Sequence, residues 1–180
     1  MNDTCLRIAG LTFAAFAFAG AAHAAGVKIP MSSVNAQGID KPIGSITAID
    51  TPDGLRLTPN LRNLPAGDHG FHVHDKASCE AAPDPDKGGA MTPALGAGGH
   101  FDPASSGKHE GPMGMGHKGD LPLLVVAANG KASKPVVAPH LTLKDISGHA
   151  VMIHAGGDNY ADQPAKLGGG GGRIACGVAP

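Results

Sequence analysis

Aromatic residues are scarce in this chain, which has no tryptophan, one tyrosine and five phenylalanines. Three of the five phenylalanines lie before residue 20, which leaves Phe71, Phe101 and Tyr160 for the rest of the chain. The core must therefore be built mainly from Val, Ile, Leu and Ala, and we expect covalent or metal cross-links to supplement packing. A convincing helical repeat of apolar residues is also missing, which argues against a helical fold.

Long hydrophobic runs and an excess of charge are absent too. The 14 basic and 15 acidic residues give a net charge of −1, and nothing indicates a surface that binds nucleic acid or membrane. The apolar stretch from Ile8 to Ala22 is shorter than the roughly 20 residues that a bilayer requires. It has the length of a secretory h-region, and Ala22-His23-Ala24 fits the small-x-small cleavage rule. We predict a signal peptide over residues 1–24, one mature domain over 25–180, and no stable membrane insertion after cleavage.

Cysteine is almost as rare as tyrosine. Cys5 lies in the predicted signal peptide, so Cys79 and Cys176 remain in the mature chain. Only one intramolecular pairing is then possible, and an exported domain with an even number of cysteines predicts a disulfide.

What the chain does contain is a series of short strand-like runs, separated by Gly, Pro, Asn or Asp. The predicted strands are Val27–Met31, Ile43–Asp50, Gly54–Pro59, Gly70–His74, Leu121–Ala127, Ala150–His154 and Arg173–Val178. Such spacing predicts an all-β sandwich or barrel. Two longer segments, Lys76–Asp120 and Ala155–Gly172, interrupt it, and ordered loops of this length are usually functional. The glycine run 168–172 alone would fit a flexible linker, but Cys176 follows closely, which favours a tethered loop.

Histidine is abundant. The stretch GFHVH places His72 and His74 two residues apart, so on a strand their side chains share one face. A pair like this is compatible with a hydrogen-bonded core, with a solvent-facing strand, or with a metal site. His69 is an odd number of residues away and should not join the pair; we expect it to make structural hydrogen bonds.

The segment from Gly98 to Asp120 favours metal binding. It carries His100, His109, His117 and Asp120, and three imidazoles with a carboxylate form a complete tetrahedral set for zinc. The alternative is a solvated histidine-rich loop. His154 ends another predicted strand and could meet His72 and His74 across the sandwich, giving the all-imidazole coordination that suits copper.

Together these stretches resemble the bacterial exported (periplasmic-type) copper–zinc superoxide dismutases. The matching motifs, in the family's order, are GFHVH, GGHFDP, KHEGP, GHKGDLP, MIHAGGDN and GGGGGRIACG. The resemblance covers essentially the whole mature chain. It implies a Greek-key β-sandwich or flattened barrel with two long functional loops, and a periplasmic location.

The resemblance also implies a role for each matching residue. Copper would be bound by His72, His74, His100 and His154, and zinc by His100, His109, His117 and Asp120, so that His100 bridges the two metals. Asp158 would link a copper-bound and a zinc-bound histidine, Arg173 would lie beside the copper, and Cys79 would pair with Cys176.

The implied activity is dismutation of superoxide to dioxygen and hydrogen peroxide, by a redox-cycling copper bridged through His100 to a structural zinc. Arg173 would attract and orient the anion. The alternatives are a non-catalytic copper or zinc binding module in the same fold, and a structural sandwich with incidental histidines. Flexible loop residues are the expected role of Met113 and Met115, with soft ligation of copper during loading as the alternative. Monomer and homodimer are both open.

Overall fold

A computed structural model of the chain describes residues 26–180, so the predicted signal peptide lies outside the described part. Almost all of its regular structure is β. The strands are β1 (Val27–Asn35), β2 (Gly38–Thr51), β3 (Gly54–Leu61), β4 (Gly67–His69), β5 (Phe71–His74), β6 (Ala82–Asp84), β7 (Ala90–Thr92), β8 (Leu124–Val126), β9 (Val136–Ala138), β10 (Ala150–His154) and β11 (Arg173–Val178). The helices are α1 (Leu143–Ile146) and the 3₁₀ turns η1 (Pro85–Lys87), η2 (Leu95–Ala97) and η3 (Lys166–Gly169). No helix within residues 26–180 has the length and apolar character needed to cross a membrane.

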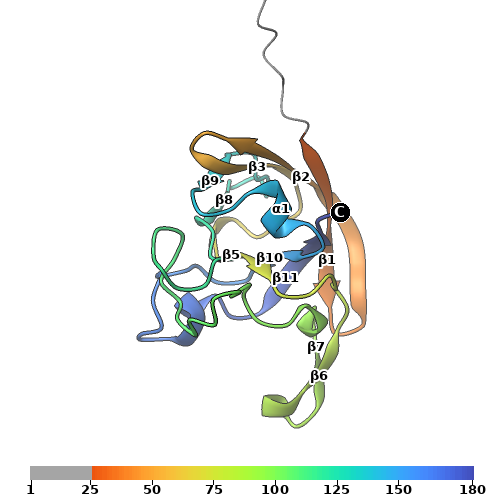
Figure 1. Cartoon of the computed structure of the whole chain (residues 1–180). Helices are drawn as coiled ribbons and strands as arrows, with labels where there is room; N and C mark the ends of the chain where they lie inside the picture. Colours follow the sequence, from red (N-terminus) through yellow and green to blue (C-terminus); the bar gives the residue numbers. More distant parts are fainter. Residues whose placement is uncertain (1–25) are drawn as a thin grey trace, which may run out of the picture.

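Seven of the strands form one antiparallel sheet in the order β5-β10-β11-β1-β2-β3-β9. The sheet curls, and the short β4–β8 pair lies near its β3 and β9 end (Figure 1). The last strand pairs with the first, and β10 pairs with β5, neighbours far apart along the chain that are typical of Greek-key connections. The prediction of an all-β sandwich or flattened barrel is confirmed.

The core lies inside the curled sheet and is almost entirely aliphatic. Along β3 every second residue is buried, namely Leu55, Leu57, Pro59 and Leu61, which is the periodicity of a strand with one face inward. Phe71 is the only aromatic residue among the largest fully buried side chains of the described chain. The expectation that Val, Ile, Leu and Ala would build the core is confirmed.

All seven predicted strands exist, and several differ in length. The strand predicted at Ile43–Asp50 begins at Gly38, and the one predicted at Leu121–Ala127 is reduced to β8. Strands β4, β6, β7 and β9 were not predicted, because three residues are too few to show alternation. Helix α1 was missed for a similar reason: it is one turn, stabilised by a capping box in which Thr142 and Asp145 exchange hydrogen bonds.

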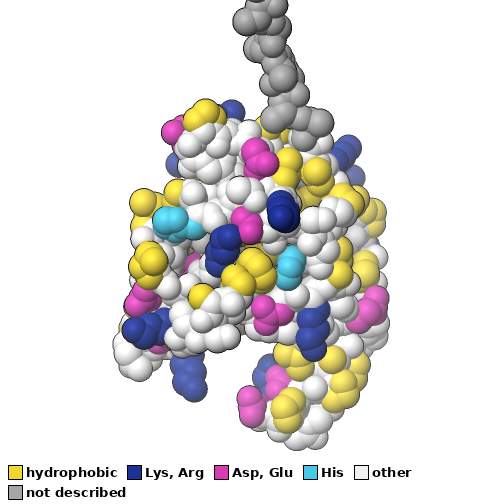
Figure 2. Space-filling view, viewed as in Figure 1, with side chains coloured by type: hydrophobic (Ala, Val, Ile, Leu, Met, Phe, Trp, Pro, Cys, Tyr) yellow, Lys and Arg dark blue, Asp and Glu magenta, His cyan; other side chains and the backbone are white. Residues whose placement is uncertain are grey.

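Two long loops connect these strands, as predicted. The first joins β5 to β8 and includes the β6–β7 hairpin, which projects from the body of the molecule (Figures 1 and 2). The second joins β10 to β11. A disulfide between Cys79 and Cys176, with a Cα–Cα distance of 5.7 Å, fastens the first loop to β11. The predicted disulfide is therefore confirmed.

Candidate metal centre

Adjacent strands place three histidines together. His72 and His74 lie on β5, where Phe71 and Val73 point into the core and the histidines point the other way. On β10, Met152 pairs with His72 and Ala150 pairs with His74, so His154 lies just beyond the start of β5. The pairing of β10 with β11 shifts its register at His154, and a bulge of this kind re-aims a side chain.

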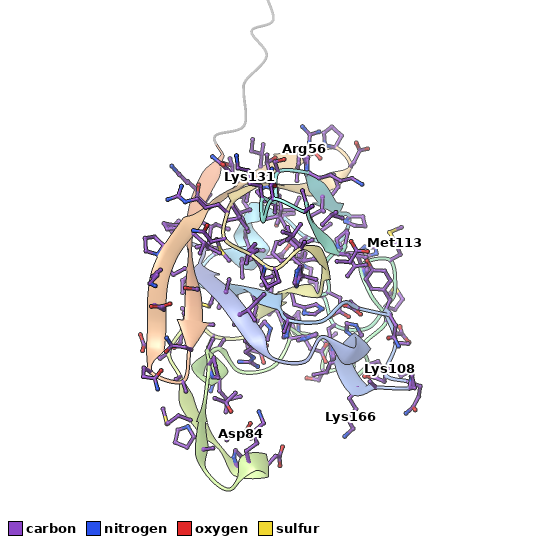
Figure 3. The ribbon with its side chains drawn as sticks, turned by 180° about the vertical axis from the view of Figure 1, so that it is seen from behind. Arg56, Asp84, Lys108, Met113, Lys131 and Lys166 are labelled. Atoms are coloured by element: carbon purple, nitrogen blue, oxygen red, sulfur yellow. A yellow bond between two sulfur atoms is a disulfide. The ribbon has the colours of Figure 1, made fainter. Side chains whose placement is uncertain are left out.

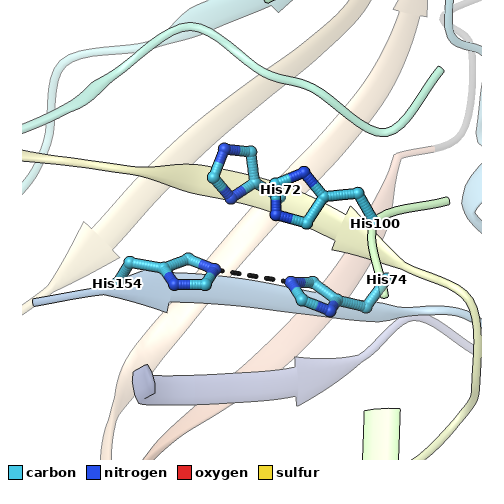
Figure 4. A group of neighbouring side chains, drawn as sticks. All are labelled: His72, His74, His100 and His154. Atoms are coloured by element: carbon cyan, nitrogen blue, oxygen red, sulfur yellow. Dashed lines mark hydrogen bonds between the residues drawn. The ribbon is translucent and has the colours of Figure 1, made fainter. Parts of the chain in front are cut away.

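The first long loop adds His100 to this group. His100 forms an isolated bridge with His74, and the next residue, Phe101, donates its N–H to the carbonyl of Val73. The rings of His72 and His100 are stacked with centroids 3.9 Å apart. One nitrogen from each of His72, His74, His100 and His154 lies within 4.8 Å of the others, and all four residues are buried (Figure 4).

A second group shares His72 and His100 with the first. Ligand atoms of His72, His100, His109 and Asp120 also lie within 4.8 Å of one another. His100 Nδ1 is 2.9 Å from Asp120 Oδ1, and His109 Nδ1 is 2.9 Å from Asp120 Oδ2. The structure thus brings His100, His109 and Asp120 together as the sequence indicated. His117 lies beside them, with Nδ1 3.6 Å from Asp120 Oδ1.

The carboxylate of Asp158 connects the two groups. Its Oδ2 accepts a hydrogen bond from His72 Nε2 at 2.8 Å, and its Oδ1 accepts one from His109 Nε2 at 2.7 Å. Each ring is thereby turned so that Nδ1 points inward. The buried Nδ1 atoms of His72 and His117 have no hydrogen-bond partner within residues 26–180, and His109 Nδ1 faces only Asp120 Oδ2, which belongs to the same group. Buried polar atoms are otherwise nearly always satisfied, so these nitrogens fit metal ligands.

Glycine in the second loop is required by its close packing against this carboxylate. Gly168 has φ +70°, and a Cβ there would lie 1.8 Å from Asp158 Oδ1 and 2.8 Å from His109 Nε2. A Cβ on Gly170 would lie 3.3 Å from the Cβ of His154. Gly168 and Gly170 therefore pack closely against the site, which agrees with the predicted tethered loop.

Burial keeps two of the histidine rings neutral, as metal binding requires. Burial lowers the pKa of His100 to about 4 and that of His154 to about 3, so both rings are neutral at pH 7 and can offer a lone pair. Burial also lowers the pKa of His109, but hydrogen bonds to Asp120 and Asp158 outweigh it and raise this pKa to about 9. His109 is therefore protonated at pH 7, and a metal that binds its Nδ1 must displace this proton. Burial raises the pKa values of the two carboxyls, and the hydrogen bonds from the histidines bring them well below their usual range. Two carboxylates in one buried group attract a cation.

Arg173 lies across from His154, its cross-strand partner on β11. Its guanidinium donates to the carbonyl of Ala94 at 2.5 Å and to the carbonyl of Gly98 at 2.6 Å. The Gly98 carbonyl also accepts a hydrogen bond from His74 Nδ1 at 3.0 Å. Arg173, His74 and His154 line one cavity of about 260 Å³, together with Lys166. A small anion can therefore reach the first histidine group past two cationic side chains.

Known proteins share this arrangement. The family described as copper/zinc superoxide dismutase (SODC) matches residues 43–179. The chain belongs to the copper/zinc superoxide dismutase family. The Escherichia coli K12 protein named Superoxide dismutase [Cu-Zn] is 51% identical over 169 residues, which cover 93% of this chain and 96% of that one.

Solved structures of the family agree with the fold. Cu/Zn superoxide dismutase from Brucella abortus superposes with a TM-score of 0.83 at 44% identity, over 87% of this chain and 100% of that one. The monomeric copper, zinc superoxide dismutase from Salmonella enterica gives a TM-score of 0.77 at 50% identity, over 87% of this chain and 100% of that one.

As a copper/zinc superoxide dismutase, the chain is an oxidoreductase that converts superoxide to dioxygen and hydrogen peroxide with copper and zinc as cofactors. The family, fold class, activity and cofactors predicted from the sequence are confirmed. The two alternatives, a metal-storage module and a structural sandwich, are disfavoured by these relatives.

Three histidines are predicted to lie outside the metal sites: His69 to make structural hydrogen bonds, and His140 and His149 to lie at the surface or at a strand end. His69 is buried, and its ring nitrogens lie 2.7 Å from the carbonyl of His154 and 2.9 Å from that of Pro65. His140 is exposed, and His149 is half-buried at the start of β10 with its Nδ1 2.9 Å from the carbonyl of His74.

Two residues around the site were missed by sequence reasoning. Tyr160 accepts a hydrogen bond from the N–H of Leu123 on its hydroxyl, and Lys118 forms an ion pair of 2.7 Å with Asp145. Tyr160 is two residues after Asp158, and Lys118 directly follows His117. Their closeness in sequence to predicted site residues is the signal that could have identified them.

Proposed function

We propose that the two histidine groups are the copper and zinc sites of this enzyme. His72, His74, His100 and His154 would hold copper. His100, His109, His117 and Asp120 would hold zinc. The observation that carries the assignment is the carboxylate of Asp158, which fixes one ring of each group with its Nδ1 turned inward. Partners of this kind orient metal-binding histidines and raise their basicity.

Separate residues would supply the proton, the metal ligands and the anion-binding charge that dismutation requires. Copper, when bound, supplies one-electron redox chemistry, because it has two accessible oxidation states and zinc has one. His100 has its Nδ1 on the Asp120 side, so its Nε2 faces the first group. This Nε2 is the atom that would hold a proton and deliver it to the reduced product. Two superoxide anions and two protons give one dioxygen and one hydrogen peroxide, so a proton source at this position is required.

Arg173 would bind and orient the anion. Its guanidinium is permanently charged, and two carbonyl oxygens hold it in place at the cavity that contains His74 and His154. Lys166 at the same cavity adds to the positive field that draws superoxide inward, an effect that weakens with salt.

We also propose that residues 1–24 are a signal peptide and that the mature enzyme, beginning near Ala25, works in the periplasm. A disulfide persists in oxidising compartments, and Cys79–Cys176 is consistent with one. The relatives are bacterial. Mass spectrometry of the protein recovered from a periplasmic fraction tests both points, because an uncut N-terminus or a cytoplasmic protein would refute them. Ultracentrifugation decides between a monomer and a homodimer.

One experiment tests the assignment of the metal sites. Copper and zinc are measured per chain, followed by the rate of superoxide dismutation by the loaded protein. We expect one copper, one zinc and full activity. One of each metal without activity would favour storage or delivery, and the absence of stoichiometric metal would refute the assignment.

A further inference from the structure

The proposed zinc ligands border a cavity of their own. This cavity has a volume of about 240 Å³, and its walls include Ala104, Met115, His117, Lys118, Asp120 and His140. The cavity at Arg173 has a different set of walls, and the two have no residue in common. The second metal group therefore has a separate opening to the solvent.

His117 is the least firmly held of the proposed zinc ligands. Its side chain is 10% exposed, whereas those of His109 and Asp120 are 0% exposed. Asp158 fixes the ring of His109 through Nε2, and Asp120 accepts a hydrogen bond from the N–H of Gly111. His117 Nδ1 lies 3.6 Å from Asp120, beyond hydrogen-bond range, and has no partner in the described part of the chain.

The segment that carries His117, residues 112–118, lies at the surface, and its backbone N–H groups donate only to residues of the same loop. Met113 is 76% exposed and Met115 is 86% exposed, and Figure 3 shows Met113 at the outer edge of this loop. The N–H of His117 donates to the carbonyl of Lys108 at 2.8 Å, and the ion pair between Lys118 and Asp145 ties the segment to α1. A segment with such contacts opens at low free-energy cost.

We propose that zinc exchanges with the solvent through this cavity, with His117 as the first ligand to leave, and that copper does not use this route. The proposal rests on the zinc ligand set given under the proposed function. His109 and Asp120 would keep their places during exchange, because Asp158 and the N–H of Gly111 hold them, and His100 would be kept in place by its backbone bridge to His74. Lys118 is a positioning residue, since its ion pair keeps the neighbouring His117 closed over the cavity.

The route can be tested by narrowing the cavity. Ala104 is an exposed residue in its wall, so Ala104→Phe adds a ring there without disturbing the core. Zinc release from the loaded enzyme is followed with a metallochromic chelator, and copper release with a chelator specific for Cu(I) under reduction. We expect zinc release to slow by about tenfold, a barrier increase of about 1.4 kcal/mol, with copper release unchanged. Ala128→Phe, at an exposed turn outside both cavities, is the matched control and should release zinc at the parental rate.

A second variant should change the rate of zinc release in the opposite direction. Lys118→Met removes the ion pair with Asp145, and we expect it to release zinc faster while copper release stays the same. Unchanged zinc release in Ala104→Phe, or equal slowing of zinc and copper, overturns the route. Should Ala104→Phe fail to fold, unchanged zinc release in Lys118→Met overturns it instead. The zinc content of the loaded wild-type protein separates the two proposals: a protein without bound zinc refutes the ligand set, whereas a full zinc site with unaltered release refutes the route alone.

Discussion

Replacing Asp158 by Asn should weaken zinc binding and change the copper site in one step. The carboxylate now accepts hydrogen bonds from His72 at 2.8 Å and from His109 at 2.7 Å, and all three side chains are fully buried. An amide of the same shape has one acceptor oxygen, so at least one ring loses its partner and faces an N–H₂ group instead. A hydrogen bond to a charged group contributes about 1.5–3 kcal/mol, and loss of such a partner lowers metal affinity roughly 10- to 100-fold.

The assay is competition between the protein and a zinc chelator of known affinity, together with the visible and electron paramagnetic resonance spectra of the copper form. Asp102→Asn is the matched control, because Asp102 binds Ser106 and Gly107 in the first long loop and no histidine ring. Gly168→Ala should reproduce the effect of Asp158→Asn, since its Cβ would displace the Asp158 carboxylate. Zinc affinity equal to wild type in both Asp158→Asn and Gly168→Ala would show that the reasoning about this carboxylate is wrong.

Three further predictions concern the same centre. Arg173→Ala should slow dismutation roughly 10- to 100-fold, the value of one charged hydrogen bond of about 1.5–3 kcal/mol, with both metals retained by elemental analysis. His100→Ala should disturb both metal sites, seen as reduced copper and zinc per chain, whereas an effect on one metal alone would contradict its shared position. Cys176→Ser opens a cross-link between residues 97 apart and should lower the free energy of unfolding by up to about 4.7 kcal/mol, measured by chemical denaturation.

Much of this centre follows from sequence periodicity, and the remainder depends on long-range pairing. Two histidines at positions 72 and 74 must share a strand face, and the structure has them on β5. That His154 joins them depends on β10 pairing with β5, which no local pattern reveals. In the same way, Asp158 is 86 residues away from the His72 ring that it holds, so its role came from the family resemblance.

The prediction of strands from the sequence is also limited by long-range pairing. The predicted bounds of strands β10 and β11 match those in the structure. Each strand combines apolar residues with a clear boundary, such as the glycine run before Arg173. Strand β9 has three residues between prolines, and its existence is decided by its pairing with β3. Local sequence cannot encode an element whose stability comes mainly from a distant partner.

The carbonyl oxygen of Gly98 serves both His74 and Arg173, and its residue adopts a left-handed φ of +77° that favours glycine. The proposed copper ligand His74 and the proposed anion-binding residue Arg173 are thus held by the same oxygen atom. A shift of Gly98 would move the hydrogen-bond partner of both side chains at once, so we expect His74 and Arg173 to move together. One carbonyl oxygen thereby couples the position of a proposed metal ligand to that of the residue proposed to receive the substrate.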